Sequence, residues 1–217
     1  MRGRLNAARK ALEYVKDGMV VGLGSGRTSE VFIRLLGRSG RKVVGVPTSK
    51  RSERVAKKAG LVVRELNDVE RVDLAVDGAD QVDEKLNLIK GYGGALFREK
   101  VVDYAARKFV VVVDESKLRK ELGGWVPVEV APFAVEQVKR KLKGLGVEVR
   151  ERVKGKRRFI TDNGNVILDV YFERIKNPKK VHGVLKEIPG VIETGLFFGK
   201  VWRVVVGEER GVRVLMV

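Results

Sequence analysis

The chain has 217 residues, of which 44% are hydrophobic, so it is long enough and apolar enough to form a globular protein of one or two domains. It has no cysteine and a single histidine, His182, which excludes disulfides and cysteine–zinc sites and disfavours histidine-rich metal sites. The net charge of +17 is typical of nucleic-acid-binding proteins. The basic excess is spread over both halves of the chain, however, without the interleaved aromatic residues of a base-stacking surface. We therefore expect a solvated basic surface and no nucleic-acid partner.

The apolar runs are too short to cross a bilayer, and residues 1–15 have the pattern of an amphipathic helix rather than of a signal peptide. We expect a protein of the cytoplasm with no membrane partner. The absence of cysteine and the 34% of charged residues also fit a heat-adapted source.

Helical and strand patterns alternate from the N-terminus to residue 125. A first helix over residues 5–15 ends at Asp17-Gly18. Predicted strands follow over residues 19–23, 42–46, 61–66, 73–76 and 109–113. Predicted helices lie over residues 31–36, 51–59 and 96–107, with N-caps at Thr28 or Ser29 for the first of these and at Thr48 or Ser49 for the second. This order predicts an α/β fold, a mainly parallel sheet with helices on both faces.

The pattern changes after Trp125. Strands are predicted over residues 126–130, 147–152, 158–161, 166–170 and 190–194, and helices over residues 132–143 and 179–188. The strands over 158–161 and 166–170 flank the hairpin signal Asp162-Asn163-Gly164-Asn165. The order βαββαβ predicts a small ferredoxin-like α+β domain. Two more strand patterns in residues 197–217 return to the first sheet, which predicts one domain of residues 1–125 with 197–217 and another of residues 126–196.

Four loops follow predicted parallel strands and therefore meet at one edge of the sheet, where such folds bind ligands. They cover residues 24–28, 47–50, 77–80 and 114–117. The first contains Gly22-Leu23-Gly24-Ser25-Gly26-Arg27-Thr28, which fits a phosphate or oxyanion cradle at a helix N-terminus, or only a tight turn. It matches neither a dinucleotide fingerprint nor a Walker loop.

Charged residues gather in the stretch from Val76 to Lys100. Asp77 and Asp80 can divide acid and base roles, hold Mg²⁺ or cap a helix, whereas Asp83 and Glu84 are expected to be solvated. Lys90, set among glycines, can bring an ammonium group to a developing oxyanion. Glu99, taken alone, fits an exposed position on a helix beside Arg98 and Lys100.

These motifs in this order resemble the A type of ribose-5-phosphate isomerase, over nearly the whole chain. The segments that carry the resemblance are VGLGSGRT at 21–28, VDGAD at 76–80, IKGYGGALFREK at 89–100, DESK at 114–117, PVEV at 127–130, TDNGNVILD at 161–169 and IPGVIETGLF at 188–197. The resemblance implies a Rossmann-like domain with a ferredoxin-like domain, and metal-independent, cofactor-free isomerisation of ribose 5-phosphate to ribulose 5-phosphate in the pentose phosphate pathway. It also implies a homo-oligomer, a dimer or a tetramer.

The resemblance also implies roles for particular residues. The catalytic residues would be Glu99 as proton acceptor, Lys90 as oxyanion stabiliser, and Asp77 and Asp80 as hydroxyl partners. The sugar phosphate would bind to Ser25, Gly26, Arg27, Thr28, Asp77, Gly78, Ala79, Asp80, Lys90, Gly91, Tyr92, Gly93 and Lys117. No residue is expected to bind a metal.

Three positions depart from the family pattern. The cradle usually reads T-G-S-T but here is Ser25-Gly26-Arg27-Thr28, and Tyr92 replaces the middle of three glycines. A phosphate-reaching lysine of the family's first helix has Arg4 as its nearest equivalent in this chain.

The alternative functions are those of another sugar-phosphate enzyme or an acyl-CoA transferase on a related fold, or of a sugar-phosphate-sensing domain without catalysis.

Overall fold

The computed structural model describes residues 2–216, which form two compact units. The first unit contains the residues up to Ala79, Arg98–Leu118 and the residues from Gly199 onward. The second contains Asp80–Phe97 and Arg119–Phe198. The expected domain boundaries at residues 125 and 197 stay a prediction, and these compact units additionally group residues 80–97, 119–125 and 197–198 with the second unit.

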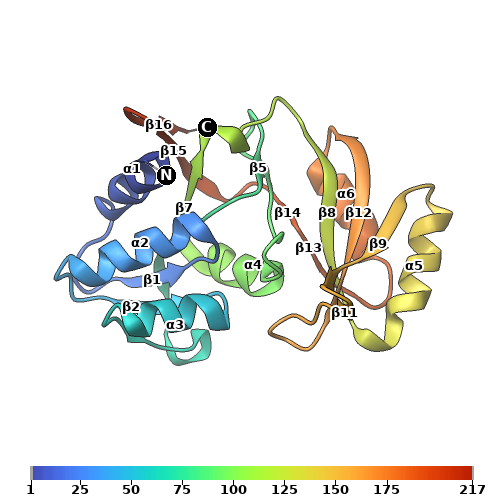
Figure 1. Cartoon of the computed structure of the whole chain (residues 1–217), viewed down its shortest axis with the longest axis horizontal. Coiled ribbons are helices and arrows are strands. Elements are labelled where there is room, and N and C mark those ends of the chain that lie inside the picture. Colours follow the sequence, from blue (N-terminus) through green and yellow to red (C-terminus); the bar gives the residue numbers. More distant parts are fainter. Residues whose placement is uncertain (1, 217) are drawn as a thin grey trace. The chain divides into compact units, whose positions relative to one another are not determined.

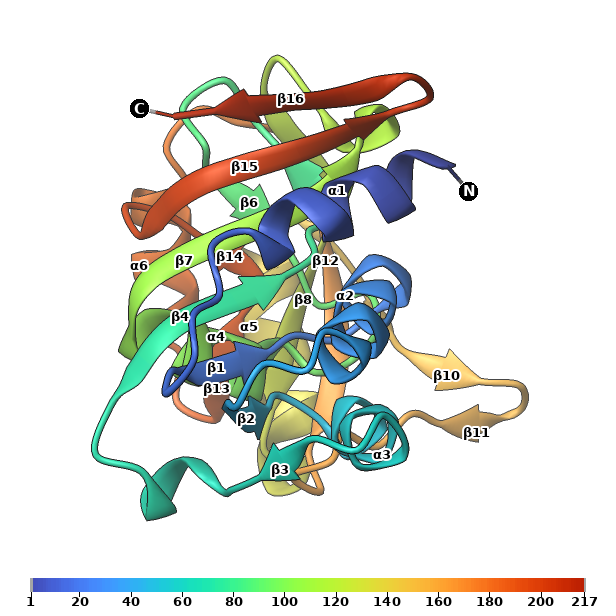
Figure 2. The same cartoon turned by 90° about the vertical axis from the view of Figure 1, so that its left-hand side faces the viewer.

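The first unit is built on a seven-stranded sheet (Figures 1 and 2). The strands from β15 to β3 run parallel to their neighbours, and β16 pairs antiparallel with β15 at one edge. In spatial order they are β16 (Gly211–Leu215), β15 (Val201–Glu208), β7 (Ala106–Asp114), β4 (Val72–Asp77), β1 (Val20–Leu23), β2 (Val44–Pro47) and β3 (Val62–Val63). The predicted return of the C-terminal strands to this sheet is confirmed.

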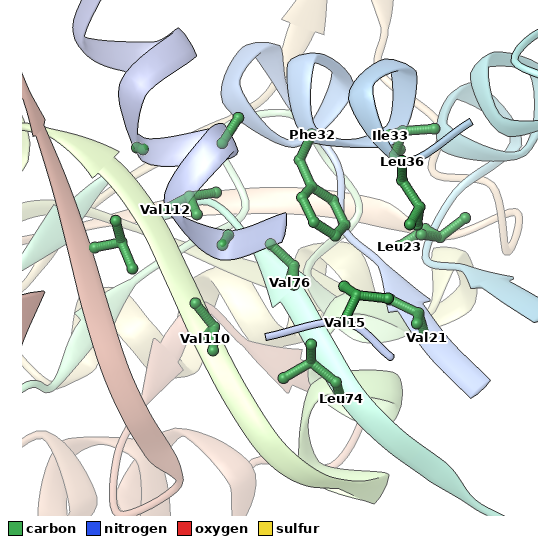
Figure 3. Packing of buried hydrophobic residues seen from close by; sticks show 14 of the residues in the cluster. Val15, Val21, Leu23, Phe32, Ile33, Leu36, Leu74, Val76, Val110 and Val112 are labelled. Carbon is green, nitrogen blue, oxygen red and sulfur yellow. The ribbon is translucent and has the colours of Figure 1, made fainter. Parts of the chain in front are cut away.

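Helices cover both faces of this sheet, as predicted from the alternation of strands and helices. They are α1 (Arg2–Leu12), α2 (Arg27–Arg38), α3 (Lys50–Lys58) and α4 (Leu96–Ala105), with short 3₁₀ turns η1 (Leu66–Asp68) and η2 (Glu115–Lys117). On one face, α2 buries Phe32, Ile33 and Leu36, the one-sided spacing of an amphipathic helix, and Figure 3 shows them directed toward Leu23 and neighbouring strand residues. On the other face, α4 lies so close to β1 that a Cβ atom on Gly22 would be 2.8 Å from the Val102 side chain.

The second unit contains a four-stranded antiparallel sheet in the order β13 (Val191–Thr194), β8 (Leu122–Val130), β12 (Val166–Ile175) and β9 (Glu148–Glu151). The helices α5 (Val135–Gly144), which follows η3 (Pro132–Ala134), and α6 (Pro178–Lys186) pack their apolar residues on one face of it. This is the predicted ferredoxin-like arrangement. A three-stranded sheet of β14 (Leu196–Phe197), β6 (Leu88–Ile89) and β5 (Gln81–Val82) also belongs to this unit.

Several local predictions were wrong. Helix α2 begins at Arg27 with Gly26 as its N-cap and without a side-chain cap, so neither Thr28 nor Ser29 caps it. The predicted strand over residues 158–161 is not continuous, because Arg158 ends β11 and Ile160 forms only a single bridge with Val166. A hairpin that the sequence did not predict, β10 (Val153–Lys154) and β11 (Arg157–Arg158), extends from the four-stranded sheet (Figure 2). In contrast, Ser49 caps α3 as predicted, by accepting a hydrogen bond from the Ser52 N–H.

Candidate active site

Three of the four predicted loops meet at the carboxyl ends of β1, β2 and β4 in the first unit. The Ser25 hydroxyl donates to Ser49 Oγ at 2.7 Å and lies 2.9 Å from Thr48 Oγ1. The backbone N–H of Gly24 donates to the Val76 carbonyl at 3.0 Å. These bonds hold the loops after three different strands together as one polar surface. Thr48 and Ser49 were predicted as helix caps in one of the converging loops but not as site residues, and their contact with Ser25 depends on the sheet order.

Asp77 lies at the centre of this first-unit surface. It ends β4 and is fully buried, and its Oδ1 accepts hydrogen bonds from Ser25 N at 2.9 Å, Gly78 N at 2.6 Å and Ser29 Oγ at 3.1 Å. Hydrogen bonds of this kind stabilise a buried carboxylate and fix its orientation. A Cβ atom on Gly24 would lie 2.1 Å from the Asp77 carboxyl carbon, so this contact requires glycine.

Gly26, Arg27 and Thr28 form the start of α2, next to Ser25. Gly26 has φ 106°, a conformation that L side chains rarely adopt, and Arg27 is exposed. The Ser29 side chain, which was predicted as a possible cap, instead is buried and donates to Asp77 and to the Ser25 carbonyl. The predicted cradle therefore consists of a helix N-terminus with a glycine before it and a partly exposed threonine in it.

Glu99 lies in the first turn of α4 and is only 4% exposed. The alternative interpretation of Glu99 as an exposed helix residue was therefore wrong. Lys100 and Asp103 of the same helix are buried as well. The positive end of the helix dipole favours a carboxylate in the first turn, and burial removes it from bulk water.

The loop after β7 carries Asp114 and Lys117. Burial alone would raise the pKa of the Asp114 carboxyl, but hydrogen bonds from Ser116 and the positive charges of Arg4 and Lys117 outweigh it, so this pKa lies below its usual value. Arg4 Nε lies 3.4 Å from Asp114 Oδ2. Arg4, the nearest equivalent of the phosphate-reaching lysine of the family, therefore forms an ion pair with this carboxylate. Lys117 is partly exposed at the end of η2.

The second unit holds the lysine–glycine loop, residues 90–94. Lys90 is 2% exposed, its backbone N–H donates to the Gly195 carbonyl at 2.8 Å, and its ammonium lies 5.3 Å from the centre of the Phe197 ring. Asp80 accepts a hydrogen bond from the Tyr92 N–H on its Oδ2 at 2.9 Å. Asp80 and the lysine–glycine loop are therefore in contact within the second unit.

Tyr92 is partly exposed, and its hydroxyl donates to the Trp125 carbonyl at 3.1 Å. Burial, followed by the negative charges of Asp80 and Asp169, raises the pKa of the phenol. Tyr92 is therefore a neutral hydrogen-bond donor at neutral pH, held to its own unit by both its backbone and its side chain.

Asp83 was predicted to be solvated, and this was wrong. It is 8% exposed and accepts hydrogen bonds from the backbone N–H groups of Lys85 and Asn87 and from the Asn87 side chain. It stabilises the turn between β5 and β6. Glu84 is exposed as predicted.

The candidate residues therefore fall into two groups, one in each unit. Ser25, Gly26, Arg27, Thr28, Asp77, Gly78, Ala79, Glu99 and Lys117 belong to the first unit, and Asp80, Lys90, Gly91, Tyr92 and Gly93 to the second. The chain passes between the units four times, and the first two crossings are the peptide bonds Ala79–Asp80 and Phe97–Arg98. These two crossings lie inside the sequence motifs, two residues or fewer from Asp77, Asp80 or Glu99.

Residues 2–216 contain neither a cluster of metal-ligating side chains nor a helix that could span a membrane. No group of three or more His, Asp or Glu side chains in this range could hold a metal ion. No helix in the same range has the length and hydropathy to cross a membrane.

Comparisons with known proteins agree on one family. The family model described as "Ribose 5-phosphate isomerase A (phosphoriboisomerase A)" matches residues 44–211. The chain is 49% identical to the ribose-5-phosphate isomerase A of Thermosynechococcus vestitus over 93% of this chain and 89% of that protein. It is 46% identical to the one of Gloeobacter violaceus over 96% of this chain and 94% of that protein.

Solved structures give the same result. Ribose 5-phosphate isomerase A from Methanocaldococcus jannaschii superposes with a TM-score of 0.94 at 43% identity, covering 99% of this chain and 98% of that one. A D-ribose-5-phosphate isomerase in complex with phospho-erythronic acid superposes with a TM-score of 0.95 at 42% identity, covering 99% and 97% of the two chains. The fold, the order of the motifs and these relatives together show that the chain belongs to the ribose 5-phosphate isomerase A family.

Proposed function

We propose that this protein interconverts D-ribose 5-phosphate and D-ribulose 5-phosphate, the aldose–ketose isomerisation of the non-oxidative pentose phosphate pathway. One observation carries the proposal: a relative with 42% identity and a TM-score of 0.95 is solved in complex with phospho-erythronic acid. The carboxylate of this four-carbon acid phosphate has two oxygens on one carbon next to a hydroxyl-bearing carbon. It therefore resembles the enediolate that lies between the two sugars.

The reaction needs three kinds of group. A base must remove the weakly acidic proton from C2 of the open-chain aldose and return a proton to C1. A positive charge or N–H donors must stabilise the enediolate oxygen. Acid and base groups must also open the furanose ring and move a proton from O2 to O1.

We assign the base to Glu99. It is the buried carboxylate of the first unit that lies in a helical first turn. A carboxylate removed from water is a stronger base toward a carbon acid, because it does not have to shed a hydration shell first.

We assign oxyanion stabilisation to Lys90 and to backbone N–H groups of the lysine–glycine loop. The burial of Lys90 supports this role, because a charge is worth more in a site from which water is excluded. An ammonium group can supply the positive charge for which other enzymes use a metal ion.

We assign the hydroxyl contacts to Asp77 and Asp80, with Asp77 in ring opening. Asp77 Oδ1 accepts three hydrogen bonds from its own unit, which fix the orientation of the carboxyl group. Gly78 and Ala79, between the two acids, would line the same part of the sugar.

We assign the phosphate group and remaining hydroxyls to Ser25, Gly26, Thr28, Lys117 and Arg27. The N-terminus of α2 and the glycine before it support an anion site. Arg27 is exposed, so its guanidinium can reach an anion without crossing the core.

The rival functions have no observation that favours them over this one. Similarity to curated ribose-5-phosphate isomerases over more than nine-tenths of the chain argues against an acyl-CoA transferase or another sugar-phosphate enzyme. Buried charges at Asp77, Lys90 and Glu99 argue against a sensing domain that has lost catalysis, since burying charge is costly without a use for it. We also propose that the protein self-associates as a dimer or tetramer and is located in the cytoplasm.

The experiment that tests the proposal measures ribulose 5-phosphate formed from ribose 5-phosphate, with and without exhaustive EDTA treatment. We expect activity that is unchanged by chelation, because Lys90 supplies the positive charge. If no ribulose 5-phosphate forms, the proposed function is wrong. Loss on chelation with recovery in Mg²⁺ or Mn²⁺ would overturn the assignment of Asp77 and Asp80 as proton-handling groups.

A further inference from the structure

The lysine–glycine loop is held by an arginine that no motif in the sequence indicated. Arg152 Nη1 donates to the Gly91 carbonyl at 2.7 Å and to the Tyr92 carbonyl at 3.1 Å. These are two successive carbonyls of the loop, immediately after Lys90. All of these residues belong to the second unit.

Arg152 is itself locked in place by Asp169. Its Nε donates to Asp169 Oδ2 at 3.0 Å and its Nη2 to Asp169 Oδ1, a two-point pairing that fixes the plane of the guanidinium. The side chains are 14% and 5% exposed. Asp169 lies in β12, between β8 and β9, so the anchor is a strand with a neighbour on each side.

A second residue supports the loop from its other end. Phe159 lies opposite Arg152 at the base of the β10–β11 hairpin, and its N–H donates to the Arg152 carbonyl at 3.0 Å. Gly94 has φ 84°, and a Cβ atom there would lie 2.3 Å from the Phe159 ring. The base of the hairpin therefore contacts the loop at Gly91, Tyr92 and Gly94.

The two carbonyl contacts determine where the loop N–H groups point. In a planar trans peptide the C=O and the following N–H point in opposite directions. The Gly91 carbonyl faces Arg152, and accordingly the Tyr92 N–H points the other way, to Asp80. The Tyr92 carbonyl also faces Arg152, so the Gly93 N–H lies on the side of its peptide away from the guanidinium.

We infer that Arg152, locked by Asp169, is a positioning residue of the isomerase: it fixes the peptide planes of the loop directly after Lys90 and thereby holds the Lys90 ammonium in place for the enediolate. Arg152 does not touch the reacting atoms in this inference and acts only through the loop. The inference rests on the proposed role of Lys90.

Arg150 provides a matched control. It is also an arginine beside Asp169, with Nε 3.9 Å from Asp169 Oδ2, but its guanidinium lies 3.9 Å above the Trp125 ring and its side chain is 58% exposed. Removing Arg150 takes a positive charge from the same carboxylate without taking the bonds to the loop carbonyls.

The test is a double-mutant cycle in kcat with Arg152→Met, Lys90→Met and the double variant, beside Arg150→Met. We expect Arg152→Met to lower kcat about 10- to 100-fold, the effect of misplacing a catalytic group by about 1 Å, with KM within about threefold. Arg150→Met should stay within about twofold. If Arg152 acts through Lys90, the double variant should be no more than about threefold slower than Lys90→Met alone.

Losses that multiply in the double variant would overturn the inference, because a general loss of folded enzyme acts independently of Lys90. Wild-type turnover in a folded Arg152→Met variant would do the same. Circular dichroism and thermal melts show whether each variant folds. If Arg152→Met does not, Arg152→Lys replaces it in the cycle under the same criteria, since one ammonium cannot hold the carboxylate and both carbonyls together.

Failure of the proposed function can be distinguished from failure of the role assigned to Lys90. A wild-type protein without isomerase activity would overturn the proposed function. Wild-type turnover in Lys90→Met would leave the isomerase activity standing but overturn the role of Lys90 and this inference with it.

Discussion

Three charged side chains to which we assign the chemistry, Asp77, Lys90 and Glu99, are less than 5% exposed. Transferring a charged group from water to a protein interior costs several kcal/mol unless other groups compensate for the lost hydration. Proteins retain such groups mainly in ion pairs and at functional sites. The burial of all three side chains therefore favours catalytic roles over the role of surface charges that keep a protein in solution.

Glu99→Gln tests the proposed base most directly. The substitution keeps the size of the side chain and removes the proton acceptor, so kcat should fall by about 10²–10⁴ while KM changes little, because binding depends on other residues. Steady-state kinetics of ribulose 5-phosphate formation measure both constants.

The control for this variant is Glu84→Gln, which changes an exposed glutamate and should leave kcat unaltered. A folded Glu99→Gln protein with wild-type turnover would falsify the proposed mechanism.

Tyr92→Gly restores the residue that the family pattern has in the loop. The hydrogen bond from the Tyr92 N–H to Asp80 uses only the backbone of Tyr92, so glycine can make it as well. The Tyr92 hydroxyl, which glycine lacks, donates to the Trp125 carbonyl in the same unit. We therefore expect turnover to change by less than about tenfold, or about 1.4 kcal/mol. A much larger loss would mean that the phenol contacts the sugar.

At the scale of elements, the site depends on how closely β1 and β4 approach at their carboxyl ends. A methyl group on Gly24 would overlap the Asp77 carboxylate and its backbone Cα, which lie 2.1 and 2.5 Å from the Cβ position. Gly24→Ala should thus lower the free energy of unfolding by about 1–3 kcal/mol, the usual cost of overpacking, and should also lower kcat because Asp77 is displaced. Urea unfolding and steady-state kinetics measure the two effects.

Gly183→Ala is the matched control for this prediction. Gly183 lies inside α6, and apart from its chain neighbours and the backbone of its own helix no atom lies within 4 Å of its Cβ position, so alanine should keep or raise stability there. Equal unfolding midpoints for Gly24→Ala and the wild type would contradict the close approach of the two strands.

At the scale of the whole molecule, we expect self-association. Phe133 is fully exposed in the second unit, and Leu145, Val153 and Ile160 are each more than half exposed. Burying such side chains between subunits would stabilise an assembly by about 1.5–3 kcal/mol for each large one. Light scattering coupled to size-exclusion chromatography should give a mass of two or four times 24.2 kDa, and a monomer at all concentrations would refute this expectation.

Local patterns were sufficient to predict most of the elements and the motifs. The alternation of short apolar runs with amphipathic helices predicted the parallel sheet, and the βαββαβ order predicted the four-stranded sheet of the second unit. Both patterns depend on which face of each element must be buried, and the spacing of the apolar residues indicates that face. The motifs around Asp77, Lys90 and Glu99 were recognisable because their residues are close together in the chain.

Contacts between residues far apart in the chain were decided only by the tertiary structure. Ser29 was predicted as one of two possible helix caps, but the packing of α2 beside β4 brings it to Asp77, 48 residues away. Glu99 fits an exposed helix position when its neighbours in sequence are considered alone, and only the packing of α4 buries it. Arg152 is one of several basic residues in a charged stretch, and nothing local distinguishes it. Pairing with Asp169 and with loop carbonyls 60 and 61 residues earlier makes it specific, because hydrogen bonds depend on distance in space and not along the chain.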